Sequence, residues 1–127
     1  MSKRISGAEL DVMDVLWDGA DGKVDAMLAT DIAAQLAGHK NWDLRTVKTL
    51  LGRLTQKGVI SHVPDGRRYL YSAQISREDY AAGATSRLAD RLFGGRVAPM
   101  VAFMADSRGL SAEDIAALET LIKAQKK

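Results

Sequence analysis

Apolar residues recur every three or four positions through much of the chain, which is the period of an amphipathic helix. The clearest case spans residues 43–57, where one stripe is apolar: Val47, Leu50, Leu51 and Leu54. Asp43 is the predicted N-cap of this helix, and Gly58 is its predicted end. Most of the other positions are polar, so one face of the helix is expected to be buried and the other exposed.

Two further helices are predicted ahead of this one. The first opens with the capping-box motif Ser6-Gly7-Ala8-Glu9 and is expected to stop at Gly19. The second covers residues 31–37 with Thr30 as its N-cap, and residues 24–29 include a predicted short strand between the two helices.

A β-hairpin is predicted after the third helix. The β-prone runs 59–63 and 67–73 flank the turn sequence Pro64-Asp65-Gly66. The order helix, short strand, helix, helix and hairpin is that of a winged helix-turn-helix, a mainly α fold with a small β-wing.

The last third of the chain is predicted to be helical in three pieces: residues 76–92, 96–105 and a helix that starts at Ser111, with a break at Phe93-Gly94-Gly95. These helices carry apolar faces, yet the segment is too short to close a core alone. We therefore expect residues 1–75 to form the winged helix domain and residues 76–127 to form a helical dimerisation domain. The predicted dimerisation residues are Tyr80, Leu88, Leu92, Val97, Met100, Val101, Met104, Ile115, Leu118 and Ile122.

Composition narrows the class of protein. The chain has 127 residues, of which 46% are hydrophobic and 27% charged, and it contains no cysteine, which excludes disulfides and thiolate ligands. Its apolar stretches are too short to span a bilayer, and the basic N-terminus with Lys3 and Arg4 lacks the apolar region of a secretory signal. A cytoplasmic location is the expectation.

The charge is unevenly distributed. Residues 40–68 hold seven Lys and Arg against two Asp, whereas residues 1–39 are net negative. Such asymmetry is expected when one face meets a polyanion. The third helix and the hairpin supply the predicted DNA-binding residues, which are Arg45, Thr46, Lys48, Thr49, Arg53, Arg67 and Arg68. Gly52 would let the helix backbone approach a phosphate or the groove wall.

Other functions remain open on the residues alone. A winged helix can also act as a protein-interaction adaptor, and Met100 and Met104 could line a small-molecule pocket between tail helices. No enzyme activity, cofactor or metal site is predicted, because the two histidines lie apart and no nucleophile–base pair is present. The carboxylates Asp11, Asp14 and Asp18 lie on the polar face of the first helix, where a solvated surface is the expectation.

Several segments resemble the penicillinase repressor family. The most specific is Thr46–Leu54 continued by Lys57–Ile60. The others are Glu9–Trp17, Trp42, Tyr69–Tyr71, Phe93–Gly95 and Leu110-Ser111. The resemblance covers nearly the whole chain. It implies a homodimeric repressor whose N-terminal domains bind a pseudo-palindromic operator and whose C-terminal helices interlock.

The resemblance also bears on the inducing signal. Copper-responsive members carry a cysteine-rich tail, which this chain lacks. β-Lactam-responsive members are inactivated by proteolysis after the Gly-Gly break, commonly at an Asn-Phe bond, and the corresponding bond here is Ala102-Phe103. Two interpretations stay open: a switch cut by a regulatory protease, or a Phe103 side chain that serves the dimer core.

Overall fold

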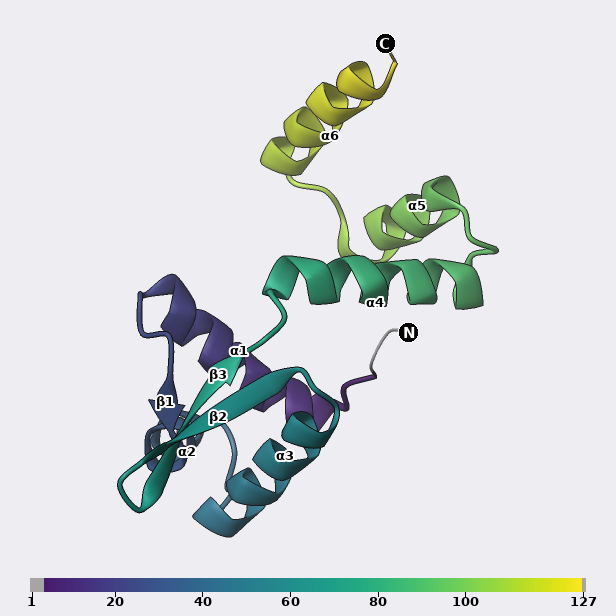
Figure 1. Cartoon of the computed structure of the whole chain (residues 1–127). Coiled ribbons are helices and arrows are strands. Elements are labelled where there is room, and N and C mark those ends of the chain that lie inside the picture. The colour runs from purple at the N-terminus through teal and green to yellow at the C-terminus, as the bar shows by residue number, and fades with distance from the viewer. Residues whose placement is uncertain (1–3, 127) are drawn as a thin grey trace. The chain divides into compact units, whose positions relative to one another are not determined.

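The computed structural model describes residues 4–126, so Lys3 of the basic N-terminus lies outside the described residues. It is mainly helical with one small sheet, as predicted (Figure 1). The elements in chain order are α1 (Gly7–Asp21), β1 (Met27–Leu28), α2 (Ala29–Leu36), α3 (Leu44–Gln56), β2 (Ile60–Asp65), β3 (Arg68–Ala73), α4 (Arg77–Leu92), α5 (Val97–Arg108) and α6 (Ala112–Gln125). The chain divides into two compact units between Gly83 and Ala84, which is inside α4.

Helix α1 begins as predicted and ends later than predicted. The Ser6 hydroxyl accepts the backbone N–H of Glu9, and the Glu9 carboxylate accepts that of Ser6, which completes the capping box. The predicted stop at Gly19 is wrong, because Gly19 lies inside the helix. A Cβ there would come within 3.2 Å of the Val24 carbonyl and of the Met27 sulfur, so this glycine serves a close approach.

The second helix starts one residue before the predicted cap. Leu28 is extended because it pairs with Leu70 in the sheet, and α2 follows directly from it without a side-chain cap. Thr30, the predicted N-cap, is therefore a helical residue, and the strand β1 covers only two residues of the predicted range.

The sheet is antiparallel and has the strand order β1-β3-β2. Its hairpin pairs His62 with Tyr71 and Asp65 with Arg68. Strand β2 continues through Pro64 to Asp65, so the turn lies at Gly66 and Arg67 and not at the predicted Pro-Asp-Gly; Gly66 has a φ of +66°. Arg67 is thereby placed at the tip of the wing.

The core of the first unit is formed by helices α1 to α3 and the sheet. All fifteen buried hydrophobic side chains lie between Val12 and Ile60, and the predicted stripe of α3 is among them. Trp17 closes the core toward α4: its indole N–H donates to the carbonyl of Ile75 at 2.9 Å, and its ring lies 5.9 Å from that of Tyr80. Tyr80, predicted for the dimer, is half-buried against this core.

The second unit lacks such a core. Within the described residues, α4, α5 and α6 contain no buried side chain. The Phe93-Gly94-Gly95 break is present, and both glycines have positive φ, 61° and 75°. Helix α5 ends three residues later than predicted, and its Phe103 packs on Phe93 with 5.8 Å between ring centroids.

Candidate nucleic-acid interface

Helix α3 is fixed at both ends by hydrogen bonds to its free backbone groups. The Asp43 carboxylate accepts the backbone N–H of Thr46 at 2.9 Å, and this bond lowers the pKa of Asp43, so the predicted cap is ionised at neutral pH. At the other end Gly58 has a φ of +77°, and the N–H groups of Gly58 and Val59 donate to the carbonyls of Thr55 and Leu54.

The two faces of α3 separate as the sequence predicted. Val47, Leu50, Leu51 and Leu54 are at most 5% exposed and form part of the core. The five predicted contact residues of this helix are all exposed: Arg45, Thr46, Lys48, Thr49 and Arg53. The buried stripe therefore holds α3 against the domain while the polar face stays available to a partner.

Two small residues on the exposed face have different roles. The Thr49 hydroxyl donates to the Arg45 carbonyl at 3.1 Å, so it can offer a partner its lone pairs and its methyl group but not this proton. Gly52 is exposed, and a Cβ there would meet no atom within 4 Å. The packing of this protein does not require glycine at position 52, although glycine weakens a helix.

The wing and α3 border a common cavity of about 270 Å³. Lys48 of α3, Arg67 and Arg68 of the wing tip and Thr30 at the start of α2 line it together with Tyr69 and Tyr71. Arg45, Lys48 and Thr49 border a second hollow on α3. The structure thus brings Lys48 together with both wing arginines, whereas Arg53 lines neither space.

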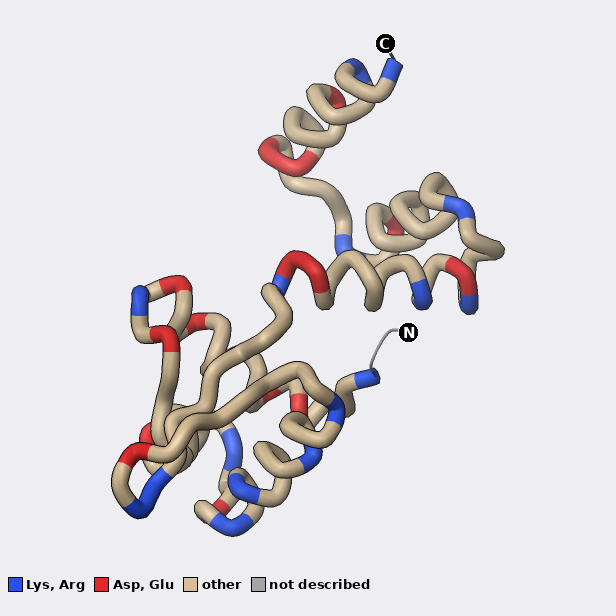
Figure 2. The backbone as a smooth tube through the Cα atoms, in the orientation of Figure 1, with Lys and Arg blue, Asp and Glu red and all other residues tan. Residues whose placement is uncertain are grey.

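The ion pairs sort the basic residues into two groups. Lys40 lies 3.4 Å from Asp11, and Lys57 lies 2.5 Å from Glu9. In residues 4–126, no ion pair involves the other five cations of the basic segment: Arg45, Lys48, Arg53, Arg67 and Arg68. Figure 2 shows the blue residues along α3 and at the tip of the β2–β3 hairpin. The cations predicted to contact DNA are therefore those left without a carboxylate partner.

Thr30, Tyr69 and Tyr71 line the cavity between α3 and the wing, and none of them was among the predicted DNA-binding residues. Thr30 joins it because α2 starts early, which the capping pattern did not indicate. Tyr69 is 47% exposed, and its ring centroid lies 4.4 Å from that of His62. Alternation along the two strands places these rings on one face once the register is known, so the hairpin register is the signal that could have found them.

Behind this surface, an ion pair joins α3 to α1. Glu9 is 1% exposed, and the Lys57 ammonium also donates to the Arg4 carbonyl at 2.8 Å. Burial alone would raise the pKa of Glu9, but the hydrogen bonds from Lys57 and Ser6 outweigh it and the pKa is lowered. The pair holds the C-terminal end of α3 against the first helix.

The sequence of the chain matches a known protein family. The family model described as penicillinase repressor matches residues 5–124, nearly all of the chain. The chain belongs to the penicillinase repressor family. The family membership confirms the predicted class of function, a DNA-binding transcriptional repressor.

Individual members of the penicillinase repressor family agree with this assignment. The penicillinase repressor of Bacillus licheniformis is 29% identical over 97% of this chain and 92% of its own length. The solution structure of the DNA-binding domain of the repressor BlaI covers 63% of this chain and 94% of its own, with 34% identity and a TM-score of 0.52. The monomeric form of Bacillus licheniformis BlaI in complex with the blaP half-operator covers 61% of this chain and 89% of its own, with 32% identity and a TM-score of 0.50. The predicted winged helix fold is thereby confirmed.

Two structural features are absent from the part of the chain that the structure describes, residues 4–126. Within them, no three His, Asp or Glu side chains are grouped so that they could hold a metal ion. No helix in this range is long and apolar enough to cross a membrane.

Proposed function

We propose that this DNA-binding repressor acts as a homodimer in which each subunit presents α3 to the major groove of one operator half-site. The observation that carries the proposal is the group of five cations on α3 and the wing that lack carboxylate partners. An α-helix fits the major groove, and arginine can donate two hydrogen bonds to guanine.

The residues divide into two roles. Arg45 and Arg53 are assigned to base edges together with Thr46 and Thr49, because they lie on the exposed face of α3. Lys48, Arg67 and Arg68 are assigned to the phosphates, since they border one cavity beside the start of α2 and cations on a wing fix register without reading sequence. The Bacillus licheniformis BlaI complex contains a monomeric form on a half-operator, which supports one subunit for each half-site.

The tail is assigned to dimerisation. Seven of the ten residues predicted for the dimer are exposed in the single chain: Leu88, Leu92, Val97, Val101, Met104, Ile115 and Ile122. A surface with this many large apolar side chains usually marks a protein interface. A second copy of the same segment would cover it with two-fold symmetry and match a pseudo-palindromic operator. The dimerisation domain proposed from the sequence begins at residue 76, whereas the compact second unit begins at Ala84.

DNA binding is tested with single substitutions in the full chain. Arg53→Ala should weaken binding to the chain's own promoter region by about 1–3 kcal/mol and relax preference at one base pair. Arg67→Ala should weaken binding to all sequences alike and reduce its salt dependence. Fluorescence anisotropy measures both, with Arg91→Ala in α4 as the control. Absence of binding at low salt would contradict the proposal, and binding to an acidic protein instead would favour the adaptor function.

Gly52 gives a test that separates stability from binding. Gly52→Ala should raise the free energy of unfolding by about 0.5–1 kcal/mol, because alanine is the better helix former and the site is open. The same methyl group would meet DNA if α3 lies deep in the groove, so affinity should fall. A variant that is more stable and binds operator equally well would show that α3 does not approach the groove at this position.

A regulatory protease remains a prediction. The Ala102-Phe103 bond lies in the middle of α5, and both residues are exposed. Because a protease needs an extended substrate, α5 would have to unwind before cleavage, and the two glycines of the break lie directly ahead of it. Mass spectrometry of the repressor from induced cells would show fragments ending at Ala102 if this bond is the switch.

A further inference from the structure

We infer that Arg77 is a positioning residue for operator binding, because it joins the first turn of α4 to α1 and so fixes the direction in which α4 begins on the first compact unit. The inference rests on the proposed homodimer, since α4 connects the winged helix, which carries the proposed DNA-binding residues, to the tail that begins at Ala84. Arg77 belongs to the first compact unit, and so do all the residues that it contacts.

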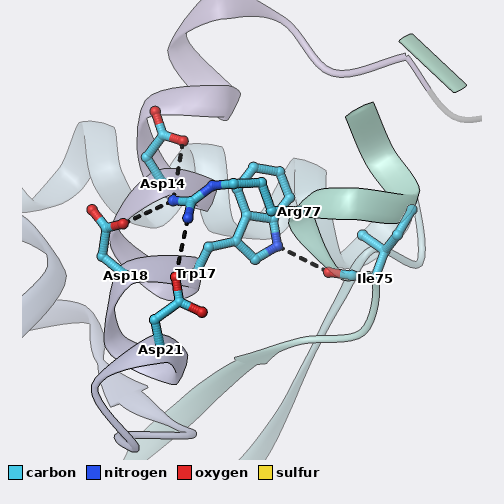
Figure 3. A network of polar contacts seen from close by, with 6 residues as sticks. All are labelled: Asp14, Trp17, Asp18, Asp21, Ile75 and Arg77. Carbon is cyan, nitrogen blue, oxygen red and sulfur yellow. Dashed lines mark hydrogen bonds and ion pairs between the residues drawn. The ribbon is translucent and has the colours of Figure 1, made fainter. Parts of the chain in front are cut away.

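The guanidinium of Arg77 lies among three carboxylates of one helix. Its two terminal nitrogens lie 2.8 Å from Asp18 and 3.1 Å from Asp21, and Asp14 lies 3.8 Å away (Figure 3). Residues 14, 18 and 21 are spaced by four and three, so they occupy one face of α1. A planar guanidinium that bonds two separate carboxylates is restricted in both position and orientation.

Trp17 of α1 also contacts the start of α4. The Arg77 guanidinium carbon lies 5.3 Å from the centroid of the Trp17 ring, within the range of a cation–π contact. The Trp17 indole N–H holds the Ile75 carbonyl just before α4, and its ring packs on Tyr80 one turn into the helix. Three consecutive parts of the junction are therefore attached to α1 by different contacts.

These contacts suit orientation better than stability. The Arg77 side chain is 38% exposed, and those of Asp14, Asp18 and Asp21 are 53%, 69% and 74% exposed. A single exposed ion pair adds little to the free energy of folding, but a network of several charges with good geometry can restrict the orientation of the groups that it joins. A dimeric helix-turn-helix protein needs its two recognition helices about one helical turn of DNA apart, so the orientation of the connecting helix matters. A residue that limits the direction of α4 would limit which half-site spacings one dimer can bind.

The first experiment measures spacing preference with the full chain. Operator fragments are prepared with the half-sites shifted by about one to three base pairs from their native separation. The wild-type protein should lose about 100-fold in affinity at the wrong spacing, because the second subunit can no longer engage. Arg77→Ala should flatten this dependence to less than about tenfold and bind a single half-site as the wild type does.

The second experiment needs no DNA. Because the chain contains no cysteine, Ala34→Cys in α2 and Ala82→Cys in α4 place two spin labels within the first compact unit. Pulsed electron paramagnetic resonance should give a narrow distance distribution for the wild type and a broad one for Arg77→Ala. Arg77→Lys, which keeps the charge but cannot bond two carboxylates with a planar group, should fall between them. The exchange Arg77→Glu with Asp18→Arg should narrow the distribution again.

The controls separate this inference from the proposed function. Arg91→Ala in the last turn of α4 should leave spacing preference and label distances unchanged. An Arg77→Ala variant that keeps both the spacing preference and the narrow distribution would overturn the inference while leaving the repressor function intact. If the wild type binds no operator at any spacing, the proposed function fails, and an unchanged label distribution would then also refute the positioning role.

Discussion

The two units of this repressor differ in how many of their large apolar side chains are buried. Among residues 4–126, the winged helix contains all fifteen buried hydrophobic side chains and only three of the thirteen large apolar side chains that are exposed. The tail from Ala84 onward contains the other ten and, in the residues described, no buried side chain at all. The first unit buries most of its large apolar side chains within one chain, whereas the second leaves most of them exposed, as the proposed interface requires.

This contrast concerns how each unit is stabilised. The winged helix gains its stability from contacts within one chain, so its unfolding should not depend on protein concentration. The tail exposes residues that favour burial, and a partner that covers them stabilises it by mass action. Its stability should therefore depend on concentration, and the predictions below test this difference.

Removal of the tail should have the largest effect. A chain that ends at Gly83 should fold, remain monomeric and bind one half-site, but lose about 10²–10⁴-fold in affinity for the full operator because the two winged helix domains are no longer linked to each other. Analytical ultracentrifugation and anisotropy measure the two outcomes. A truncated chain that still dimerises would place the dimer contact in the winged helix and break the comparison.

The same substitution in the two units gives the next largest effect. Leu51 is fully buried and Leu121 is 53% exposed. Leu51→Ala should lower the free energy of unfolding by about 2–5 kcal/mol, because it leaves a cavity, and the loss should be equal at all protein concentrations. Leu121→Ala should change unfolding only where the dimer is populated. Thermal scans over a dilution series distinguish the two variants, and a concentration-independent loss for Leu121→Ala would contradict the proposed interface.

The ion pair between the buried Glu9 and the half-buried Lys57 predicts a pH dependence confined to the winged helix. The folded pKa of Glu9 lies below its ordinary value of 4.5, so the stability it contributes is present above that pH and is lost as the pH falls through the lowered value. Glu9→Gln should cost about 1–3 kcal/mol at neutral pH, since the Lys57 ammonium loses its charged acceptor.

Denaturant titrations between neutral pH and about pH 3 measure this dependence, because carboxylates take up their protons within this range. The difference in the free energy of unfolding between the wild type and Glu9→Gln should become smaller toward pH 3. Glu78→Gln, in the exposed first turn of α4, is the control. A difference that stays constant over the whole pH range would show that the carboxylate acts through packing and not through its charge.

The pattern of the sequence was sufficient for most of the winged helix. The period of the apolar stripe in α3 and the capping residues Ser6 and Asp43 were predicted as the structure has them. These features are local, so they can be recognised from neighbouring residues. The exposure of Arg45, Lys48 and Arg53 was also predicted, because a charged residue on the polar face of a helix is exposed wherever the core lies.

The errors arose where distant residues decide the local structure. Gly19 was expected to end a helix, but it lies inside α1, where a Cβ would come within 3.2 Å of Val24 and Met27, which come after the turn. Thr30 was expected to be a cap, but the pairing of Leu28 with Leu70 sets the start of α2. The Arg77 junction was missed for the same reason, since its partners on α1 are more than fifty residues away. Sequence spacing alone carries no signal for such contacts.

The smallest predicted effect comes from two helix ends in the winged helix that share one motif. At the end of α1 the N–H of Val24 donates to the Gly19 carbonyl, and the N–H of Lys23 donates to the Ala20 carbonyl. The end of α3 has the same pattern: the N–H of Val59 donates to Leu54 and that of Gly58 to Thr55. In α3 the left-handed position is a glycine, but in α1 it is Lys23, with a φ of +70°. Such a conformation costs a residue with a Cβ about 1 kcal/mol, and glycine loses part of that gain through its freedom in the unfolded chain.

Lys23→Gly should therefore raise the free energy of unfolding by about 0.5 kcal/mol, independent of protein concentration, and Gly58→Ala should lower it by a similar amount or more. Equilibrium denaturation of the chain ending at Gly83 is the sharpest measurement, because no dimer contributes. A loss of stability in Lys23→Gly would mean that the Lys23 side chain contributes more to the end of α1 than its backbone strain costs.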